Sequence, residues 1–218
     1  MRVVLFGGTF DPIHRGHLAI AAAAAQAFAL DRVLFAPTGR QPLKPGGTAA
    51  SFADRLAMVT LALASASTPP TGNAQPATCN FLPSTLDAPR SDGAPNYTVD
   101  TLTALALEYP GASLFVLTGA DSFLDLPRWR SPHQLLALAE WIVVTRPGFP
   151  LTPDLLDLPQ LAPLALTAAQ RARIHLLATV HDDVSATELR HRLHLGDPCP
   201  GLTPAAVAAY IQSHHLYR

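Results

Sequence analysis

Cysteine and charged residues are scarce in this chain of 218 residues. The two cysteines, Cys79 and Cys199, lie far apart and form neither a CxxC metal motif nor a disulfide framework. Charged residues make up 14% of the chain, hydrophobic residues make up 49%, and the net charge is −1. This balance excludes a disordered chain, and it lacks the basic footprint of a protein dedicated to nucleic acid. We expect a globular core, and a local cationic cleft for phosphates is compatible with the net charge.

The chain also lacks a hydrophobic run that could cross a membrane. The longest apolar run near its start, residues 18–30, is shorter than the roughly 20 residues that a spanning helix needs, and it is mostly alanine. Residues 1–10 lack the apolar segment of a secretion signal. We therefore expect a soluble, cytoplasmic protein with neither a membrane partner nor a nucleic-acid partner.

Lysine is the rarest charged residue, because Lys44 is the one lysine among the 15 Lys and Arg residues. Alanine and proline are abundant, so the bias is typical of a GC-rich genome. Lys44 nevertheless lies in the Pro/Gly segment QPLKPGG (41–47), where a mobile cation could close over a ligand.

Short apolar runs alternate with helical patterns along the whole chain. The runs predict buried parallel strands at 2–6, 32–37, 113–121, 141–148 and 173–179, and a further short strand at 80–82 inside the loop-rich segment 67–96. The helical patterns predict helices at 16–30, 51–65, 98–111, 131–140, 185–196 and 203–215. This alternation predicts an α/β fold: a Rossmann-like, doubly wound parallel sheet with helices on both faces. We expect a single domain over 1–218, with the small C-terminal helical portion, 185–216, part of the same unit.

Capping residues mark four of the predicted helix starts. Ser51 is a candidate N-cap, and Ser131 is followed by a proline at the first helical position. Ser185 and Glu188 have the spacing of a capping box. Thr203 is predicted to cap the following helix in the same way as Ser131.

The first glycines do not match the common phosphate-binding motifs. Gly7, Gly8 and Gly16 do not have the GxGxxG spacing of dinucleotide-binding proteins, and no lysine follows at the position that a P-loop requires. The general geometry remains, because a strand end next to a helix N-terminus can bind an anion.

His14 and His17 fall at this strand end. Their spacing places both imidazoles on one face of the first helical turn, where they can donate hydrogen bonds to phosphate oxygens. Such donors stabilise the charge that develops during attack on phosphorus. The pair could instead ligate a metal, but no third ligand with suitable spacing is visible. Without the preceding strand and glycines, the two histidines would read as a surface pair.

Several motifs together resemble the nucleotidylyltransferase superfamily. GGTFDPIHRGH (7–17) resembles its signature GGxFxPxHxGH, and VSATELR (184–190) resembles its ISSTxIR element. Three further segments resemble the bacterial nicotinate-nucleotide adenylyltransferase branch: PNYTVDT (95–101), GADSFLDLPRW (119–129) and VTRPGF (144–149).

The resemblance implies a reaction between ATP and nicotinate mononucleotide that gives deamido-NAD and pyrophosphate, as a step of NAD biosynthesis. Members of the family use Mg²⁺, which ATP carries, and form no covalent enzyme intermediate. No metal site of the protein's own is expected, and the resemblance leaves room for a homo-oligomer. The direct attack agrees with the residues present, because a phosphate monoester needs no strong general base.

The resemblance also assigns roles around the triphosphate. His14, His17 and Arg190 would be catalytic, with His17 as the main donor to the α-phosphate in the transition state. The backbone N–H groups of Gly8, Thr9 and Phe10 would hold phosphate, and the Thr9 hydroxyl could contribute a further contact.

The other end of the chain would supply the remaining ATP contacts. Thr187, together with the arginine, would bind the β- and γ-phosphates at a helix N-terminus that Ser185 caps. Gly119 and Asp121 would shape the adenosine pocket, with the carboxylate accepting from a ribose hydroxyl.

The mononucleotide would meet four residues. Trp129 would stack on the nicotinate ring, the backbone around Tyr97 and Thr98 would receive its carboxylate, and Lys44 would approach its phosphate. Two departures affect details: Ala186 stands where the family has a second serine, and Leu43 stands where a histidine often precedes the lysine.

Structural roles compete with several of these assignments. Trp129 could be a core residue, Asp121 a turn residue, and Arg190 the ion-pair partner of Glu188 or Asp197. Arg55, inside a predicted helix, is interpreted as a solvated residue or an ion-pair partner. His191 and His194 repeat the histidine spacing without a glycine turn and are interpreted as a solvated face.

Two other functions fit parts of the pattern. An adenylyltransferase for phosphopantetheine would share the signature but has no evident need for the YTVDT and LPRW segments. A nucleotide-binding regulator would have lost catalysis, although both histidines and Arg190 are present.

Overall fold

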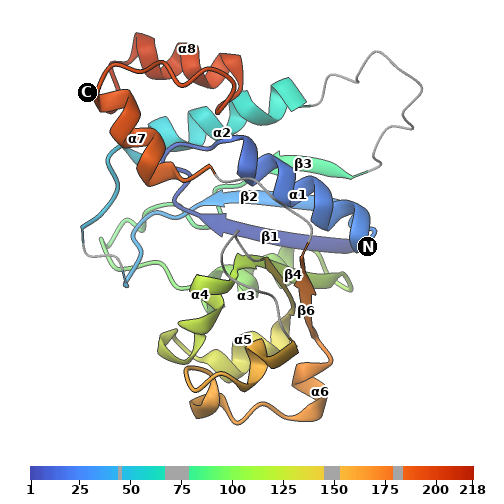
Figure 1. The fold of residues 1–218 in the computed structure, drawn as a ribbon. Coiled ribbons are helices and arrows are strands. Elements are labelled where there is room, and N and C mark those ends of the chain that lie inside the picture. Colours follow the sequence, from blue (N-terminus) through green and yellow to red (C-terminus); the bar gives the residue numbers. More distant parts are fainter. Residues whose placement is uncertain (44–45, 67–78, 145–152, 179–183) are drawn as a thin grey trace.

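One parallel sheet forms the centre of the molecule (Figure 1). The computed structural model describes residues 1–43, 46–66, 79–144, 153–178 and 184–218. Its strands lie in the order β3-β2-β1-β4-β5-β6, and every neighbouring pair is parallel. Their bounds are Arg2–Gly8 (β1), Arg32–Pro37 (β2), Asn80–Pro83 (β3), Ser113–Gly119 (β4), Glu140–Val144 (β5) and Ile174–Leu177 (β6). The predicted Rossmann-like sheet is confirmed.

Helices connect the strands and cover both faces of the sheet (Figure 1). Their bounds are Arg15–Ala27 (α1), Phe52–Ala66 (α2), Thr98–Glu108 (α3), Ala120–Leu124 (α4), Pro132–Leu138 (α5), Ala168–Arg171 (α6), Ala186–His194 (α7) and Ala205–Ser213 (α8). The sequence did not predict α4 and α6, which are too short to show helical periodicity. Strand β4 ends two residues earlier than predicted because α4 begins directly after Gly119.

Alternate side chains of each central strand enter two separate hydrophobic layers. On β1, Val4 and Phe6 pack in the layer that contains α1, α2 and α8, whereas Val3 and Leu5 pack in the layer of α3 and α5. Trp141 of β5 is fully buried in the second layer. The period of two residues therefore explains why the strands read as continuous apolar runs. Helix α8 joins the first layer through Val207 and Ile211.

The helix starts agree with the capping predictions only in part. Ser51 caps α2, since its Oγ accepts from the Asp54 N–H at 3.1 Å. Ser185 occupies the N-cap of α7, but its side chain makes no capping bond, so the predicted capping box is wrong. The α7 start is held instead by the backbone bond from the Leu189 N–H to the Ser185 carbonyl. The N-cap of α8 is Pro204 rather than Thr203, because the Pro204 carbonyl accepts the first helical bonds.

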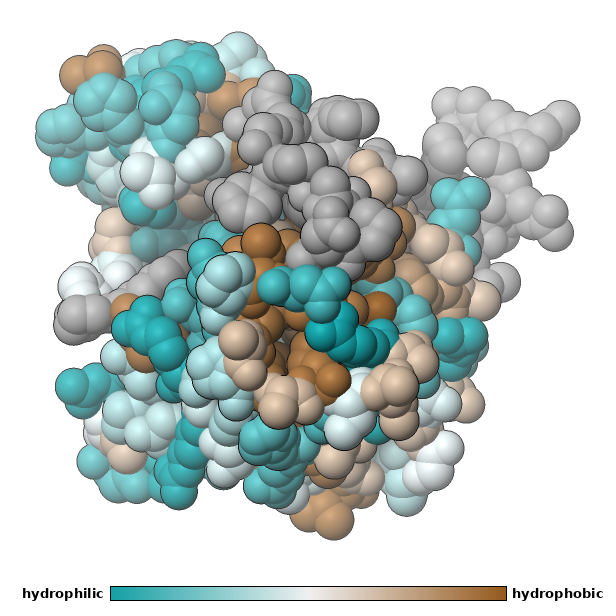
Figure 2. All heavy atoms as spheres, turned by 60° about the horizontal axis from the view of Figure 1, so that its bottom comes forward, coloured by the Kyte–Doolittle hydropathy of each residue, from teal (hydrophilic) through white to brown (hydrophobic). Residues whose placement is uncertain are grey.

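None of the helices in the described ranges is both long and apolar enough to cross a membrane. Figure 2 shows one face of the molecule, on which hydrophobic surface lies in a hollow surrounded by mostly hydrophilic residues.

The segment after β2 packs closely on residues 87–96. The Gly39 N–H donates to the Asp87 carbonyl at 2.7 Å. A Cβ atom at Gly39 would lie 2.5 Å from the backbone nitrogen of Pro89 and 2.7 Å from Oδ1 of Asn96. This position therefore has no room for a side chain.

Gly39→Ala should destabilise the protein, because backbone atoms must move to admit the methyl group. We expect a loss of about 1–3 kcal/mol, with a fall in Tm of roughly 2–4 °C for each kcal/mol, measured by calorimetry. Gly46→Ala is the matched control, because open space surrounds that position. Equal melting temperatures for the two variants would contradict the close packing.

Candidate active site

The site lies where the strand order changes direction. Strand β1 pairs with β2 on one side and with β4 on the other. The segments after β1 and β4 therefore leave the sheet side by side, at Gly8 and Gly119, and turn to opposite faces. Ligands of open α/β sheets bind in the crevice that such a switch creates.

His14 and His17 lie together at the start of α1. His14 is the N-cap residue, and the two ring centroids are 3.8 Å apart. The His14 N–H donates to Nδ1 of His17 at 3.2 Å. Because Nδ1 accepts this bond, the neutral His17 ring carries its proton on Nε2. His17 is thus fixed as a donor through Nε2.

Aromatic contacts hold the His17 ring in place. The Phe10 ring meets it edge to face with centroids 5.0 Å apart, and Phe6 lies at 6.1 Å. Phe10 is buried and has a left-handed backbone, with φ of 46°. Its ring lies against Gly8, where a Cβ would be 3.3 Å from the ring. The sequence predicted only the Phe10 backbone N–H as a contact, and the structure adds this packing role for the ring.

The stretch from Gly8 to His17, which contains both histidines, is called the histidine segment below. Arg190 reaches this segment from the other end of the chain. Its Nη1 donates to the Asp11 carbonyl at 2.8 Å, and its Nη2 donates to the Thr187 hydroxyl at 3.3 Å. Arg190 therefore contacts a residue three positions before His14, while its predicted convergence with the two histidines on one triphosphate stays a prediction.

The alternative ion pair of Arg190 with Asp197 is not formed. Asp197 pairs instead with Arg192, at 2.6 Å. His191 and His194 are exposed on the same helix, as predicted. Helix α7 thus brings Arg190 to Asp11, whereas its two histidines are exposed.

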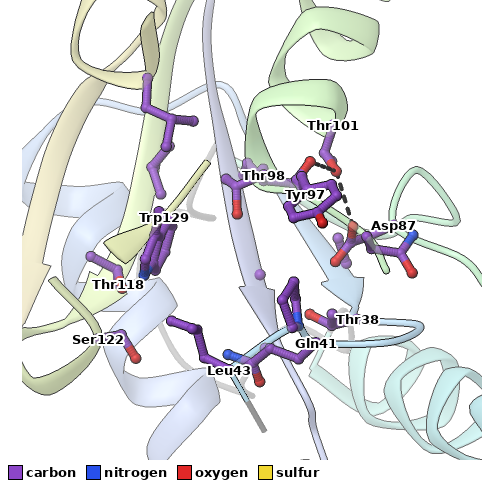
Figure 3. A pocket seen from close by; sticks show the side chains of 18 of the residues that line it. Thr38, Gln41, Leu43, Asp87, Tyr97, Thr98, Thr101, Thr118, Ser122 and Trp129 are labelled. Carbon is purple, nitrogen blue, oxygen red and sulfur yellow. Dashed lines mark hydrogen bonds between the residues drawn. The ribbon is translucent and has the colours of Figure 1, made fainter. Parts of the chain in front are cut away.

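A pocket opens beside the histidine segment and gathers the predicted substrate residues (Figure 3). Gly8 and Thr9 from the end of β1, Tyr97 and Thr98 from the start of α3, and Trp129 all line it. Its walls leave about 1030 Å³ of empty space, including open solvent.

Two aromatic side chains face each other across the pocket (Figure 3). Trp129 is half-buried and packs edge to face on Trp141, with centroids 5.9 Å apart. Tyr97 lies under the Arg130 guanidinium, 4.6 Å from the ring centroid. Trp129 is therefore both attached to the core and available to a ligand, so the two interpretations of this residue are compatible.

Gly119 and Asp121 lie at the start of α4. Gly119 is its N-cap residue, and a Cβ there would lie 2.6 Å from Oδ1 of Asp121. The exposed Asp121 carboxylate therefore folds over the glycine. Neither residue lines the pocket of Figure 3, whereas their neighbours Thr118 and Ser122 do. Lys44 lies outside the described residues.

Arg55 is buried beneath the site, and the sequence interpretation of this residue is wrong. It is 1% exposed, and its guanidinium donates to the carbonyls of Thr9, at 2.7 Å, and Thr38, at 2.8 Å. It ties the end of β1 to the end of β2. The burial of Arg55 could have been predicted from the sequence, because Arg55 lies on the same i, i+3, i+4 stripe of α2 as the buried Met58 and Val59.

Asp87 is a second buried polar residue that the sequence did not single out. Its carboxylate lines the pocket and accepts from the Thr101 hydroxyl at 3.0 Å (Figure 3). Burial raises the pKa of Asp87 to about 6, although hydrogen bonds from Thr101 and Thr38 and the charge of Arg55 oppose the rise. Asp87 lies in an irregular segment, where no periodicity reveals burial.

Across the described ranges, no three His, Cys, Asp or Glu side chains are grouped so that they could hold a metal ion. The carboxylate nearest the histidines in sequence, Asp11, already accepts from the N–H groups of Ala49 and Ala50.

Comparison with known sequences gives a consistent result. A family model described as cytidylyltransferase-like matches residues 5–192. A "Probable nicotinate-nucleotide adenylyltransferase" of Roseiflexus sp. (strain RS-1) is 42% identical over 217 residues, which cover 98% of this chain and 96% of the relative. A protein of the same name from Herpetosiphon aurantiacus is 41% identical over 218 residues, with 99% and 98% covered.

Solved structures share the fold. Two of them are Plasmodium falciparum nicotinic acid mononucleotide adenylyltransferase complexed with NaAD, with a TM-score of 0.74, and the same protein complexed with APC, with a TM-score of 0.71. Both are 16% identical to this chain and cover 99% of it, and the chain in turn covers 97% and 96% of theirs.

Asp87 should make stability depend on pH. Its ordinary pKa of 3.8 rises to about 6 in the fold, so the folded protein binds more protons than the unfolded chain between these values. The wild type should therefore lose up to about 3 kcal/mol relative to Asp87→Asn as pH rises from 4 to above 6. Denaturant unfolding of both proteins at several pH values measures this difference.

Asp92→Asn is the control for this experiment. Arg90 lowers the pKa of the exposed Asp92 to about 2, so its titration lies below the same pH window. A constant difference between wild type and Asp87→Asn from pH 4 to 7 would contradict the raised pKa.

Proposed function

The chain belongs to the cytidylyltransferase-like family, and we infer that it transfers the adenylyl group of ATP to nicotinate mononucleotide. The products are deamido-NAD and pyrophosphate, and the reaction is a step of NAD biosynthesis. The names of full-length relatives at about 40% identity support this function. The observation that carries it is the hydrogen bond from Arg190 to Asp11, which brings a cation to the histidine segment.

The reaction is a direct displacement at phosphorus. A phosphate oxygen of the mononucleotide attacks the α-phosphorus of ATP. The bond then breaks between that phosphorus and the oxygen that bridges the α- and β-phosphates. The electron pair leaves with pyrophosphate, and no proton has to be removed from the nucleophile. The protein therefore acts by positioning the reactants and by stabilising charge.

His17 is suited to the α-phosphate. Its Nδ1 accepts the His14 N–H, so a neutral His17 ring carries its proton on Nε2 and would donate to the phosphate through that nitrogen. Negative charge grows on the non-bridging oxygens during attack, and a preplaced donor stabilises it most in the transition state. His14 lies against the same ring and would contact the phosphate beside it.

The start of α7 would hold the leaving phosphates. Thr187 and Arg190 are already hydrogen-bonded to each other, and Ser185 stands at the helix N-terminus, whose partial positive charge favours anions. Mg²⁺ would enter this site as an ion carried by ATP. When bound, it neutralises phosphate charge.

The two nucleosides would lie on opposite sides of the histidine segment. Gly119 and Asp121 would receive the adenosine ribose.

Trp129 would stack on the nicotinate ring in the pocket of Figure 3, while the backbone of Tyr97 and Thr98 would receive its carboxylate. Arg130 places positive charge over Tyr97, which favours an acid over an amide. Lys44, which is not among the described residues, would approach the mononucleotide phosphate. The backbone N–H groups of Gly8, Thr9 and Phe10 would hold phosphate.

The acceptor preference tests the proposed function. Pyrophosphate release should be measured with ATP and, in separate reactions, nicotinate mononucleotide, nicotinamide mononucleotide and phosphopantetheine. We expect a clear preference for the first, because cationic and N–H groups favour its carboxylate. Equal use of the amide would contradict the carboxylate pocket, and ATP binding without release in any reaction would indicate a regulator instead.

His17→Ala should remove a donor that acts mainly in the transition state. We expect kcat to fall by about 10²–10³-fold, with KM for ATP changed much less, in steady-state assays. His191→Ala, which alters an exposed histidine on α7, should leave both constants unchanged. An effect of His17→Ala on KM alone would mean that this residue only binds the ground state.

A further inference from the structure

Asp11 accepts four hydrogen bonds. It is 3% exposed. Its Oδ2 accepts from the Ala49 N–H at 2.7 Å, and its Oδ1 accepts from the Ala50 N–H at 3.1 Å and from the Tyr217 hydroxyl at 2.7 Å. Its backbone carbonyl accepts from Arg190 at 2.8 Å. All three of its oxygens are therefore used by parts of the chain that are distant in sequence.

These bonds couple the position of Arg190 to the Asp11 side chain. The carbonyl that Arg190 contacts belongs to the same residue whose carboxylate is clamped from two sides. His14 follows three residues later, so a shift of Asp11 would move the arginine and the histidines relative to each other. Displacements of about 1 Å at such sites can cost orders of magnitude in rate.

Tyr217 is the part of this clamp that comes from outside the sheet and its crossovers. It lies in the segment after α8, has a left-handed backbone with φ of 62°, and packs against the first hydrophobic layer. Burial and the neighbouring Asp11 carboxylate raise the pKa of Tyr217. The phenol therefore keeps its proton at neutral pH and remains a donor to Asp11.

We propose that Tyr217 is a positioning residue for the triphosphate site. Tyr217 acts through its hydrogen bond to Asp11 and so fixes Arg190 relative to His14 and His17. The segment after α8, which contains Tyr217 and is called the latch below, then positions active-site residues and also packs against the first hydrophobic layer. This role rests on the proposed function, since it concerns the geometry around ATP. It requires no contact between Tyr217 and a substrate.

Tyr217→Phe tests the latch, and Tyr210→Phe is its matched control. Tyr210 donates a similar hydrogen bond to an aspartate, Asp54, at 3.0 Å, but that pair lies between α8 and α2 and has no bond to the histidine segment. We expect Tyr217→Phe to lower kcat and to weaken MgATP binding, the two together by about tenfold. Tyr210→Phe should leave both within about twofold of wild type, which is the ordinary result away from such networks.

Three measurements separate positioning from simple stabilisation. Calorimetric titration with MgATP alone reports the site, pyrophosphate release reports turnover, and hydrogen exchange reports the order of residues 8–14. Faster exchange of this segment in Tyr217→Phe, without it in Tyr210→Phe, supports the latch. Asp11→Asn, which loses an acceptor oxygen, should change ATP affinity in the same direction and more strongly.

Equal ATP affinity, turnover and exchange in the two tyrosine variants would overturn the proposal and leave Tyr217 a packing residue. Failure of the proposed function is distinguishable. If the wild type binds MgATP but releases no pyrophosphate with nicotinate mononucleotide, the function is wrong, and the affinity and exchange of the two variants still decide the latch.

Discussion

The hydrogen bond from Arg190 to the Asp11 carbonyl joins residues that lie 179 positions apart and is the interaction on which the proposed site depends. The sheet presents the histidine segment at the end of β1, but it supplies no cation for a triphosphate. In the proposed function, helix α7 brings this cation to the histidine segment through the bond from Arg190 to the Asp11 carbonyl. The chemistry thus requires tertiary structure that no single crossover of the sheet could provide.

Two buried charged residues, Arg55 beneath the site and Asp87 at the wall of the pocket, support the site. Arg55 joins the carbonyls after β1 and β2, and Asp87 lies close enough for its charge to interact with that of Arg55. Burying such groups is costly, and partners must offset the loss of water. The physical reason for burying these groups is that they hold irregular backbone next to the site. The apolar side chains of the alternating core could not do this, because they form no hydrogen bonds.

Sequence patterns predicted the parts of this structure that repeat. The β1 run ending at Gly8 identified a buried strand, the His14 spacing identified a helical face, and motif resemblance joined Arg190 to them. The short α4 left no periodic signal. Asp87 could not be found because its burial comes from tertiary packing of an irregular segment. Arg55 could have been found, since it lies on the apolar stripe of α2, but its charge outweighed its position in the interpretation.

The order of these elements along the chain has a consequence for biosynthesis. Every strand of the sheet precedes residue 178, whereas α7 begins at Ala186. The strands of the sheet therefore leave the ribosome before Arg190 does, and the histidine segment emerges long before the arginine that contacts it. A protein shortened before α7 would lack Arg190 and would also lose Val207 and Ile211 of α8 from the first hydrophobic layer, so the last 33 residues, 186–218, contribute to both the site and the core.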